Sequence, residues 1–257
     1  SNCFLLSTLW CGRNQINNID LSQFNGIESL DIKGNPISSI SVDNLNNLHN
    51  LDISYTNISS IDLTTNVYLQ WLDFGGVNED DNTGDLFWSP ITAIDLSSNI
   101  FLNDVEYQGG YLESLDLSNC IGIGYSDIDI YYPISLVCLD LSNGTNGINT
   151  DGDIINLRID DGFENTGIPC PNLCIQVDNV NISNSVWLGY IIHSNYTFST
   201  DCGDCSGTSN LPELNSNQSK QLLKIVDLIG RETTFKPNTT LIYVYDDGST
   251  EKVFTIE

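Results

Sequence analysis

The most regular feature of the chain is a six-residue frame of the form apolar-x-x-apolar-x-apolar, which recurs twelve times between residues 6 and 159. The first seven frames lie alternately 10 and 11 residues apart, which defines a repeat of 21 residues containing two frames. The central apolar residues of the first seven frames are Leu9, Ile19, Leu30, Ile40, Leu51, Ile61 and Leu72.

The last three residues of each frame alternate apolar, polar, apolar, and Asn, Gly, Ser or Thr follows. This alternation is the periodicity of a half-buried strand that ends in a turn. One repeat cannot bury its own apolar face, so neighbouring repeats must stack at the spacing of paired strands, about 4.8 Å. We therefore predict a mainly β fold, a leucine-rich-repeat solenoid with two short strands per turn.

The register is interrupted beyond residue 74, and we interpret residues 75–90, 118–134, 142–153 and 160–172 as loop insertions. The central outward position of each frame is acidic almost everywhere, so stacking should align carboxylates. We expect one column of Trp10, Asp31, Asp52, Asp73, Glu106 and Asp140, and another of Asp20, Ser41, Asp62, Asp95, Asp116 and Arg158. Such columns could collect cations, or they could form a solvated face screened by salt.

The frames LHNLDISYTNISSIDLTTN (residues 48–66) and ITAIDLSSN (residues 91–99) resemble the 21-residue leucine-rich repeats of secreted Bacteroidetes proteins. The resemblance covers most of residues 6–159. The third position after a frame often holds asparagine, and these asparagines resemble the asparagine ladder of that family. Other residues at the same position interrupt the ladder. The ladder positions are Asn14, Asn35, Asn66 and Asn99, with Cys120 at an equivalent place and Thr56, Val77 and Gly110 departing from the pattern.

Four of the eight cysteines bracket one short segment and indicate two disulfides, for which three pairings exist. They are Cys170, Cys174, Cys202 and Cys205. The segments LDLSNGTN from Leu139, CIQVDN and FSTDC resemble the last repeat and the cysteine-bearing C-terminal cap of the same family. That resemblance implies a Cys174–Cys202 bond and leaves Cys170 with Cys205.

The C-terminal segments LLKIVDLIGRET and LIYVYDDGSTEKVFTIE, within residues 222–257, resemble a type IX secretion sorting domain. The residues themselves indicate short strands with a turn at Asp247-Gly248, following a linker rich in Gly, Ser and Asn. The expected organisation is a solenoid at residues 1–169, a disulfide-bearing cap at 170–205, a linker at 206–219 and a sorting domain at 220–257. The resemblance implies export by the type IX machinery.

The net charge is −26, and residues 1–205 contain only three bases, Arg13, Lys33 and Arg158. Such an acidic body repels nucleic acid and anionic membranes, and no run of 18 apolar residues could span a bilayer. The cysteine content favours an oxidising compartment, so we predict a secreted or cell-surface protein. Because the chain starts inside a repeat and lacks methionine, we expect the native chain and its export signal to begin upstream.

The sequence offers little for catalysis. Its two histidines, His49 and His193, show no zinc-ligand spacing, and no glycine-rich phosphate loop is present. We therefore predict that the protein is not an enzyme and has no cofactor, calcium being the one candidate ion. The insertion NEDDNTGDLFW provides its possible ligands, Glu79, Asp80, Asp81 and Asp85, although a solvated loop is the favoured explanation of them.

Aromatic residues outside the frame point to binding. Trp71 occupies an outward position beside Asp52 and Asp73, and Trp88 lies in the acidic insertion with Asp81. These five residues form the predicted ligand-binding site, for which the alternative is that the insertion folds back and Trp88 covers Trp71. The favoured function is extracellular recognition or adhesion through a protein or glycan ligand, and the alternative is a structural, calcium-stabilised surface protein.

Overall fold

The computed structural model describes residues 6–76, 87–120, 127–144, 156–160, 170–187, 191–193, 195–203, 205, 222–226, 232–233, 240–245 and 250–254. The chain forms two compact units, Ser1–Thr208 and Ser209–Glu257, which we describe separately. The division falls within the segment 206–219 that the sequence suggests as a linker.

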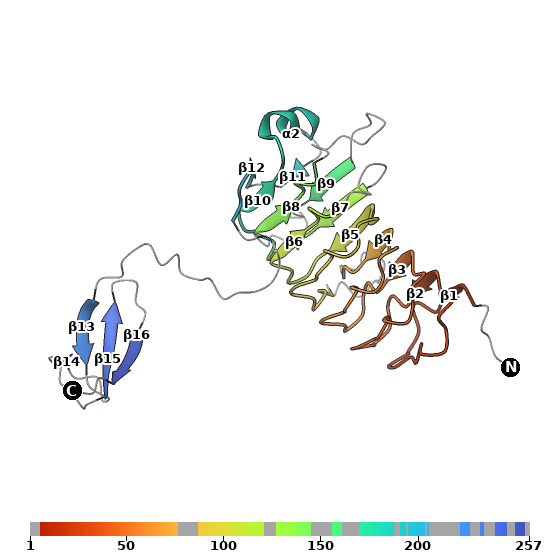
Figure 1. Ribbon diagram of the computed structural model, residues 1–257, viewed down its shortest axis with the longest axis horizontal. Coiled ribbons are helices and arrows are strands. Elements are labelled where there is room, and N and C mark those ends of the chain that lie inside the picture. The colour runs from red at the N-terminus through yellow and green to blue at the C-terminus, as the bar shows by residue number, and fades with distance from the viewer. Residues whose placement is uncertain are drawn as a thin grey trace. The chain divides into compact units, whose positions relative to one another are not determined.

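Eight short strands form the first sheet of the larger unit, and Figure 1 shows them side by side. In spatial order they are β1 (Thr8–Trp10), β2 (Ser29–Asp31), β3 (Asn50–Asp52), β4 (Trp71–Asp73), β5 (Asp104–Gln108), β7 (Asp127–Tyr131), β9 (Asn156–Asp160) and β11 (Ile191–Ile192), all parallel. The central residues Leu9, Leu30, Leu51, Leu72, Val105, Ile128 and Leu157 pair in register, and all except Leu9 are at most 1% exposed. The repeat therefore stacks one aliphatic side chain per turn into a continuous core, as a leucine-rich solenoid requires.

A second parallel sheet lies on the other side of the core, in the order β12-β10-β8-β6. Its strands are β6 (Ser114–Asp116), β8 (Cys138–Asp140), β10 (Leu173–Gln176) and β12 (Tyr196–Ser199). The frames centred on Ile19, Ile40 and Ile61 form no strand. The prediction of two strands per turn is therefore correct only from β6 onward.

Asparagine side chains, rather than a strand ladder, link the early turns on this second side. The side-chain amides of Asn44, Asn66 and Asn99 donate to the carbonyls of Leu21, Val42 and Leu63, each one turn earlier, at 2.8, 3.1 and 3.2 Å. In the strand-forming part, backbone N–H groups bridge the turns instead, as from Leu117 to Asp140 at 2.9 Å. The amides thus supply hydrogen bonds between turns where no sheet forms.

The predicted insertion at 118–134 contains a strand that the sequence interpretation missed. Strand β7 lies between β5 and β9, with Ile128 opposite Val105 and Leu157. Asp129 therefore occupies the first outward column, followed by Arg158, whereas Asp140 pairs with Asp116 in the second sheet. The predicted membership of the two columns is wrong at Asp140 and Arg158 for this reason.

The segment expected to form a cap adds strands to the solenoid. Strand β10 pairs with β8, and β12 pairs with β10, so both extend the second sheet. Between β10 and β12 lies helix α2 (Val180–Val186), whose N-terminal N–H groups at Asn181 and Ile182 donate to the Asn179 side chain. Trp187, 1% exposed, follows the helix and stacks on Phe198 of β12.

The smaller unit contains an antiparallel sheet in the order β14-β13-β15-β16. Its strands are β13 (Leu222–Val226), β14 (Glu232–Thr233), β15 (Thr240–Tyr245) and β16 (Thr250–Phe254). The β15–β16 pairing brackets the predicted Asp247-Gly248 turn, which itself lies outside the described residues. Among the described residues of both units, no helix has the length and hydrophobicity that crossing a bilayer demands.

Candidate binding face

The outward residues of the first sheet form two aligned columns, which we call the acidic face. One column, in register from turn to turn, contains Trp10, Asp31, Asp52, Asp73, Glu106, Asp129 and Arg158. The other contains Thr8, Ser29, Asn50, Trp71 and Asp104, and Asp127 pairs with Asn156 further along. Neighbouring carboxylates at strand spacing repel by about 1 kcal/mol even in water, so the face needs compensating interactions.

Lys33 compensates the first two acids of the column. Its Nζ lies 3.0 Å from Oδ2 of Asp52 and 3.6 Å from Oδ2 of Asp31. Oδ1 of Asp52 accepts from the N–H and the hydroxyl of Ser54 at 3.1 and 2.5 Å. Asp52 is only 2% exposed, so its carboxylate is bonded within the sheet and does not stand at the surface.

In the described part of the chain, no base forms an ion pair with Asp73, the next acid. Burial first, and the Asp52 carboxylate second, raise the pKa of Asp73 from 3.8 to about 8, although the N–H of Gly75 donates to it at 3.2 Å. At neutral pH the carboxyl is therefore mostly protonated. Protonation removes one negative charge from the middle of the column, as expected when a buried acid faces other acids.

The acids of β5 and β7 are more exposed and less compensated. Burial, followed by Glu106, Asp127 and Asp129, raises the pKa of Asp104 to about 6. Burial also raises the pKa of Glu106, against a hydrogen bond from the Trp71 side chain that lowers it. The buried oxygens Oδ1 of Asp104 and Oδ1 of Asp129 make no hydrogen bond.

Arg158 closes the column at β9. Its Nε lies 4.0 Å from Oδ1 of Asp129, and its guanidinium donates to the hydroxyl of Tyr131 while lying 5.8 Å from that ring's centre. Burial raises the pKa of Asp129, and Arg158 opposes this shift. Among the described residues, ion pairs with the seven carboxylates of the face are thus seen from Lys33 and Arg158.

Stacked aromatic side chains border the acidic face just before strands β3, β4 and β5. The rings of His49 and Tyr68 have centres 6.3 Å apart, and those of Tyr68 and Phe101 are 6.1 Å apart, all nearly parallel. Tyr68 is 49% and Phe101 43% exposed, and Val67 and Ile100 beside them are exposed as well. We call these residues the aromatic edge; contiguous exposed apolar groups of this kind mark interaction surfaces more often than isolated ones.

The structure separates the two tryptophans of the predicted site. Trp71 is the first residue of β4 and pairs with Asp104, whereas the residue after Trp88, Ser89, bridges Gly110 beyond the end of β5. Trp71 therefore lies beside the first residue of β5, whereas Ser89 lies beside a residue two positions past the last one. Both tryptophans are half-buried, and in the described part of the chain no ring contact joins them.

The remaining predicted ligands of this region lie outside the described residues. These are Asp81 of the binding site and the whole candidate calcium set, Glu79, Asp80, Asp81 and Asp85. Of the predicted site, Trp71 and Asp73 are therefore adjacent on β4, Asp52 lies next to Asp73 on β3, and Trp88 is distant. The sequence interpretation missed Asp104, Asp129 and the aromatic edge.

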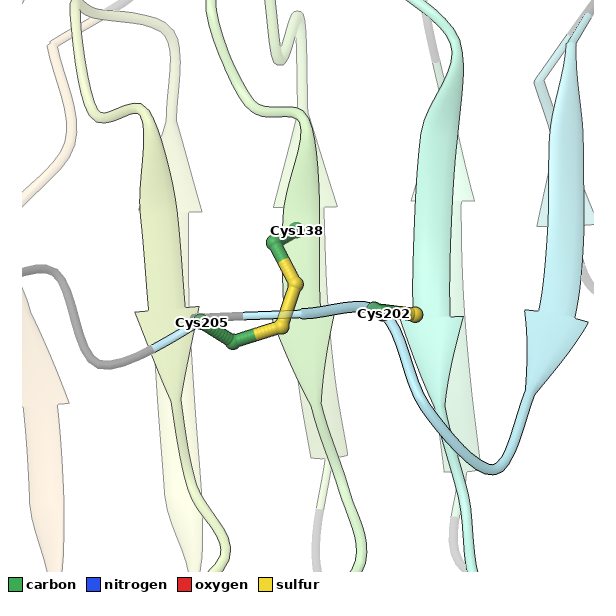
Figure 2. Close-up of side chains that lie close together, drawn as sticks. All are labelled: Cys138, Cys202 and Cys205. Atoms are coloured by element: carbon green, nitrogen blue, oxygen red, sulfur yellow. A yellow bond between two sulfur atoms is a disulfide. The ribbon is translucent and has the colours of Figure 1, made fainter. Parts of the chain in front are cut away.

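Four cysteines meet at the second sheet. Cys174 is bonded to Cys202, the pair implied by the resemblance, but Cys205 is bonded to Cys138. The expected pairing of Cys170 with Cys205 is therefore wrong. Figure 2 shows Cys205 directed at Cys138 on its strand, with Cys202 nearby. The strand register explains why Cys138 takes the place expected of Cys170, because Cys138 and Cys174 are neighbours on β8 and β10.

No family model matches the sequence, and no curated protein matches it. Two solved structures from Listeria monocytogenes are similar. The functional domain of InlJ, which includes a cysteine ladder, is 17% identical, with 98% of this chain and 62% of that domain covered, at a TM-score of 0.44. The internalin inlF is 16% identical, with 76% and 68% covered, at a TM-score of 0.35. The chain thus spans less than two thirds of the InlJ domain.

Proposed function

We propose that this protein is an extracellular or cell-surface recognition module, and that its ligand binds the first sheet across the acidic face and the aromatic edge. The observation that carries the proposal is the juxtaposition of acids that are at least partly exposed with exposed, stacked aromatic rings at the start of the same strands. These acids are Asp31, Asp104, Glu106, Asp127 and Asp129. Aromatic anchors surrounded by polar groups are the composition of energetic hot spots.

Of the two expected ligand classes, the face favours a protein with a basic surface over a glycan. Seven acids lie on this face, and the ion pairs seen with them among the described residues come from Lys33 and Arg158. Lysine or arginine side chains of a partner would supply the compensating charge. A neutral glycan would supply donors but leave the charge uncompensated.

The test uses a synthetic peptide of alternating lysine and leucine residues as probe, with neutral dextran as comparison. Replacing Tyr68, Phe101 or Trp71 by alanine should raise the Kd for the peptide at least fivefold, which corresponds to about 1 kcal/mol. Tyr111→Ala is the matched control, because Tyr111 is 47% exposed but precedes β6 of the second sheet. Equal affinity of all four variants and the parent would show attraction to net charge alone and refute this assignment.

We further propose that the smaller unit directs export through the type IX machinery. Its support is the similarity of the segments around DLIGRET and YDDG to sorting domains, together with the separate antiparallel sheet that β13 to β16 form. Deletion of residues 220–257 should abolish export from a host with that machinery. Secretion of the truncated chain at the parental level would contradict this role.

A further inference from the structure

We infer that the four cysteines at the second sheet form a tetrathiolate zinc site when the protein is reduced, so that zinc and the two disulfides are alternative ways of closing the same cluster. The ligands would be Cys138, Cys174, Cys202 and Cys205. The proposal is independent of the function proposed above.

The positions of the sulfur atoms support a metal site. The Sγ atoms of Cys138, Cys202 and Cys205 all lie within 4.8 Å of one another, and in the described residues they form the one group of potential metal ligands. The fourth sulfur, of Cys174, is bonded to that of Cys202. Zinc–sulfur bonds of about 2.3 Å in a tetrahedron separate sulfurs by about 3.8 Å, so three of the four sulfurs are close to that spacing. The sulfur of Cys174 lies outside this group and would have to move toward the other three.

The backbone supplies the ligands as two pairs, as in structural zinc sites. Cys202 and Cys205 have the C-x2-C spacing, which an assessment based on the histidines overlooks. Cys138 and Cys174 lie opposite each other on neighbouring parallel strands and so present their side chains on one face. Each strand is fixed by the core, since Leu139 and Ile175 beside them are fully buried.

Two of the sulfurs are buried, so a bound ion would be shielded from water. Cys138 is 5% and Cys205 4% exposed, and only a bound cation would make their thiolates favourable there. A dithiol reductant delivers two electrons and two protons to each disulfide and is itself oxidised to a disulfide. Zn²⁺ then displaces the four thiol protons, which leave to solvent, and four Zn–S bonds form.

The experiment uses the full chain, reduced under anaerobic conditions, freed of reductant and titrated with Co²⁺ as a spectroscopic substitute for zinc. We expect the visible absorption of tetrahedral cobalt thiolate to saturate at one ion per chain and to disappear on adding Zn²⁺. Zn²⁺ should also raise the Tm of the reduced protein, because it binds the folded state. The oxidised protein should show neither effect.

Cys205→Ser removes one ligand and should abolish the stoichiometric cobalt signal, whereas Cys11→Ser, which changes a half-buried thiol outside the cluster, should keep it. Zinc should also protect the four cluster cysteines of the reduced parent from alkylation, as mapped by mass spectrometry, which does not depend on the folding of any variant. Absence of saturable cobalt binding by the reduced parent, or alkylation of all four cysteines in the presence of zinc, would overturn the proposal.

Discussion

The asparagines of the second side offer a direct test of how the solenoid holds its early turns together. Asn66 is fully buried, and its side-chain amide donates to the carbonyls of Val42 and Leu45 at 3.1 and 2.9 Å. Both acceptors belong to the preceding turn. Replacing Asn66 by alanine therefore removes two hydrogen bonds between turns while leaving the first sheet untouched.

The cost can be worked out from the remaining bonds of the two carbonyls. Each still accepts a turn N–H, from Leu45 and from Leu48 at 2.9 and 3.0 Å, so neither becomes fully unpaired. The loss is then the net value of two hydrogen bonds, about 0.5–1.5 kcal/mol each. We expect Asn66→Ala to lower the free energy of unfolding by about 2 kcal/mol on that basis.

Urea denaturation followed by tryptophan fluorescence measures this loss, and Asn47→Ala, at an exposed asparagine of the same region, is the control. Asn66→Leu separates hydrogen bonding from volume, because leucine occupies the equivalent ladder position one turn earlier, at residue 45. If leucine restores the parental stability, or if Asn66→Ala loses no more than Asn47→Ala, the amide bonds do not hold the turns together.

Three further predictions concern charge, covalent closure and domain independence. The pKa of Asp73 is raised to about 8 in the folded state, so its protonated carboxyl should contribute stability that is complete below pH 3.8 and is lost as the pH rises toward 8. In urea denaturation at a series of pH values, Asp73→Asn should flatten this loss of stability. An unchanged slope would contradict the assignment. Replacing Cys138 and Cys205 together by alanine should lower the free energy of unfolding of the oxidised protein by about 2–4 kcal/mol, because the disulfide spans 67 residues. Calorimetry that shows no loss would exclude a stabilising Cys138–Cys205 disulfide. Deleting residues 220–257 should change the Tm of the larger unit by less than the error of a melting curve, and a large decrease would show that the two units fold together.

The core of the solenoid was predictable because the 21-residue period fixes which residue of each frame points inward. Leu51, Leu72 and Leu115 are frame centres, and all three are fully buried. The period also locates the buried asparagines, since Asn35, Asn66 and Asn99 lie at the same distance after a frame. Periodicity alone did not distinguish a true strand from an extended segment closed by side-chain amides, because both bury the same residues.

Strand β7 escaped prediction because its frame begins with a tyrosine, Tyr125, and follows no regular spacing. Ile128 lies 23 residues after Val105 and 29 before Leu157 in the sequence. Only the paired register shows that the three are neighbours. This one missed strand also displaced Asp140 and Arg158 between the predicted columns and concealed the position of Asp129.

The cysteine pairing could not follow from sequence for a related reason. Cys138 and Cys174 are 36 positions apart in the chain, yet they are opposite each other once β8 and β10 pair. With both strands in place, Cys202 and Cys205 meet one partner each, and Cys170 is not needed for either bond. Covalent partners depend on strand register, which irregular insertions hide.

The irregular part of the solenoid also concentrates acids on strands β5 and β7. From β2 to β4, each strand combines one acid with a neutral outward residue, such as Asn50, and Lys33 offsets the first acids. Strands β5 and β7 are five residues long, and each carries two acids among its outward residues, so burial first and repulsion from the neighbouring acids second raise the pKa of Asp104. A basic partner would relieve that repulsion and restore ionisation of the acid as it binds. Most of the binding energy should therefore come from β5 and β7, next to the exposed ring of Phe101. The N-terminal turns should contribute mainly shape complementarity.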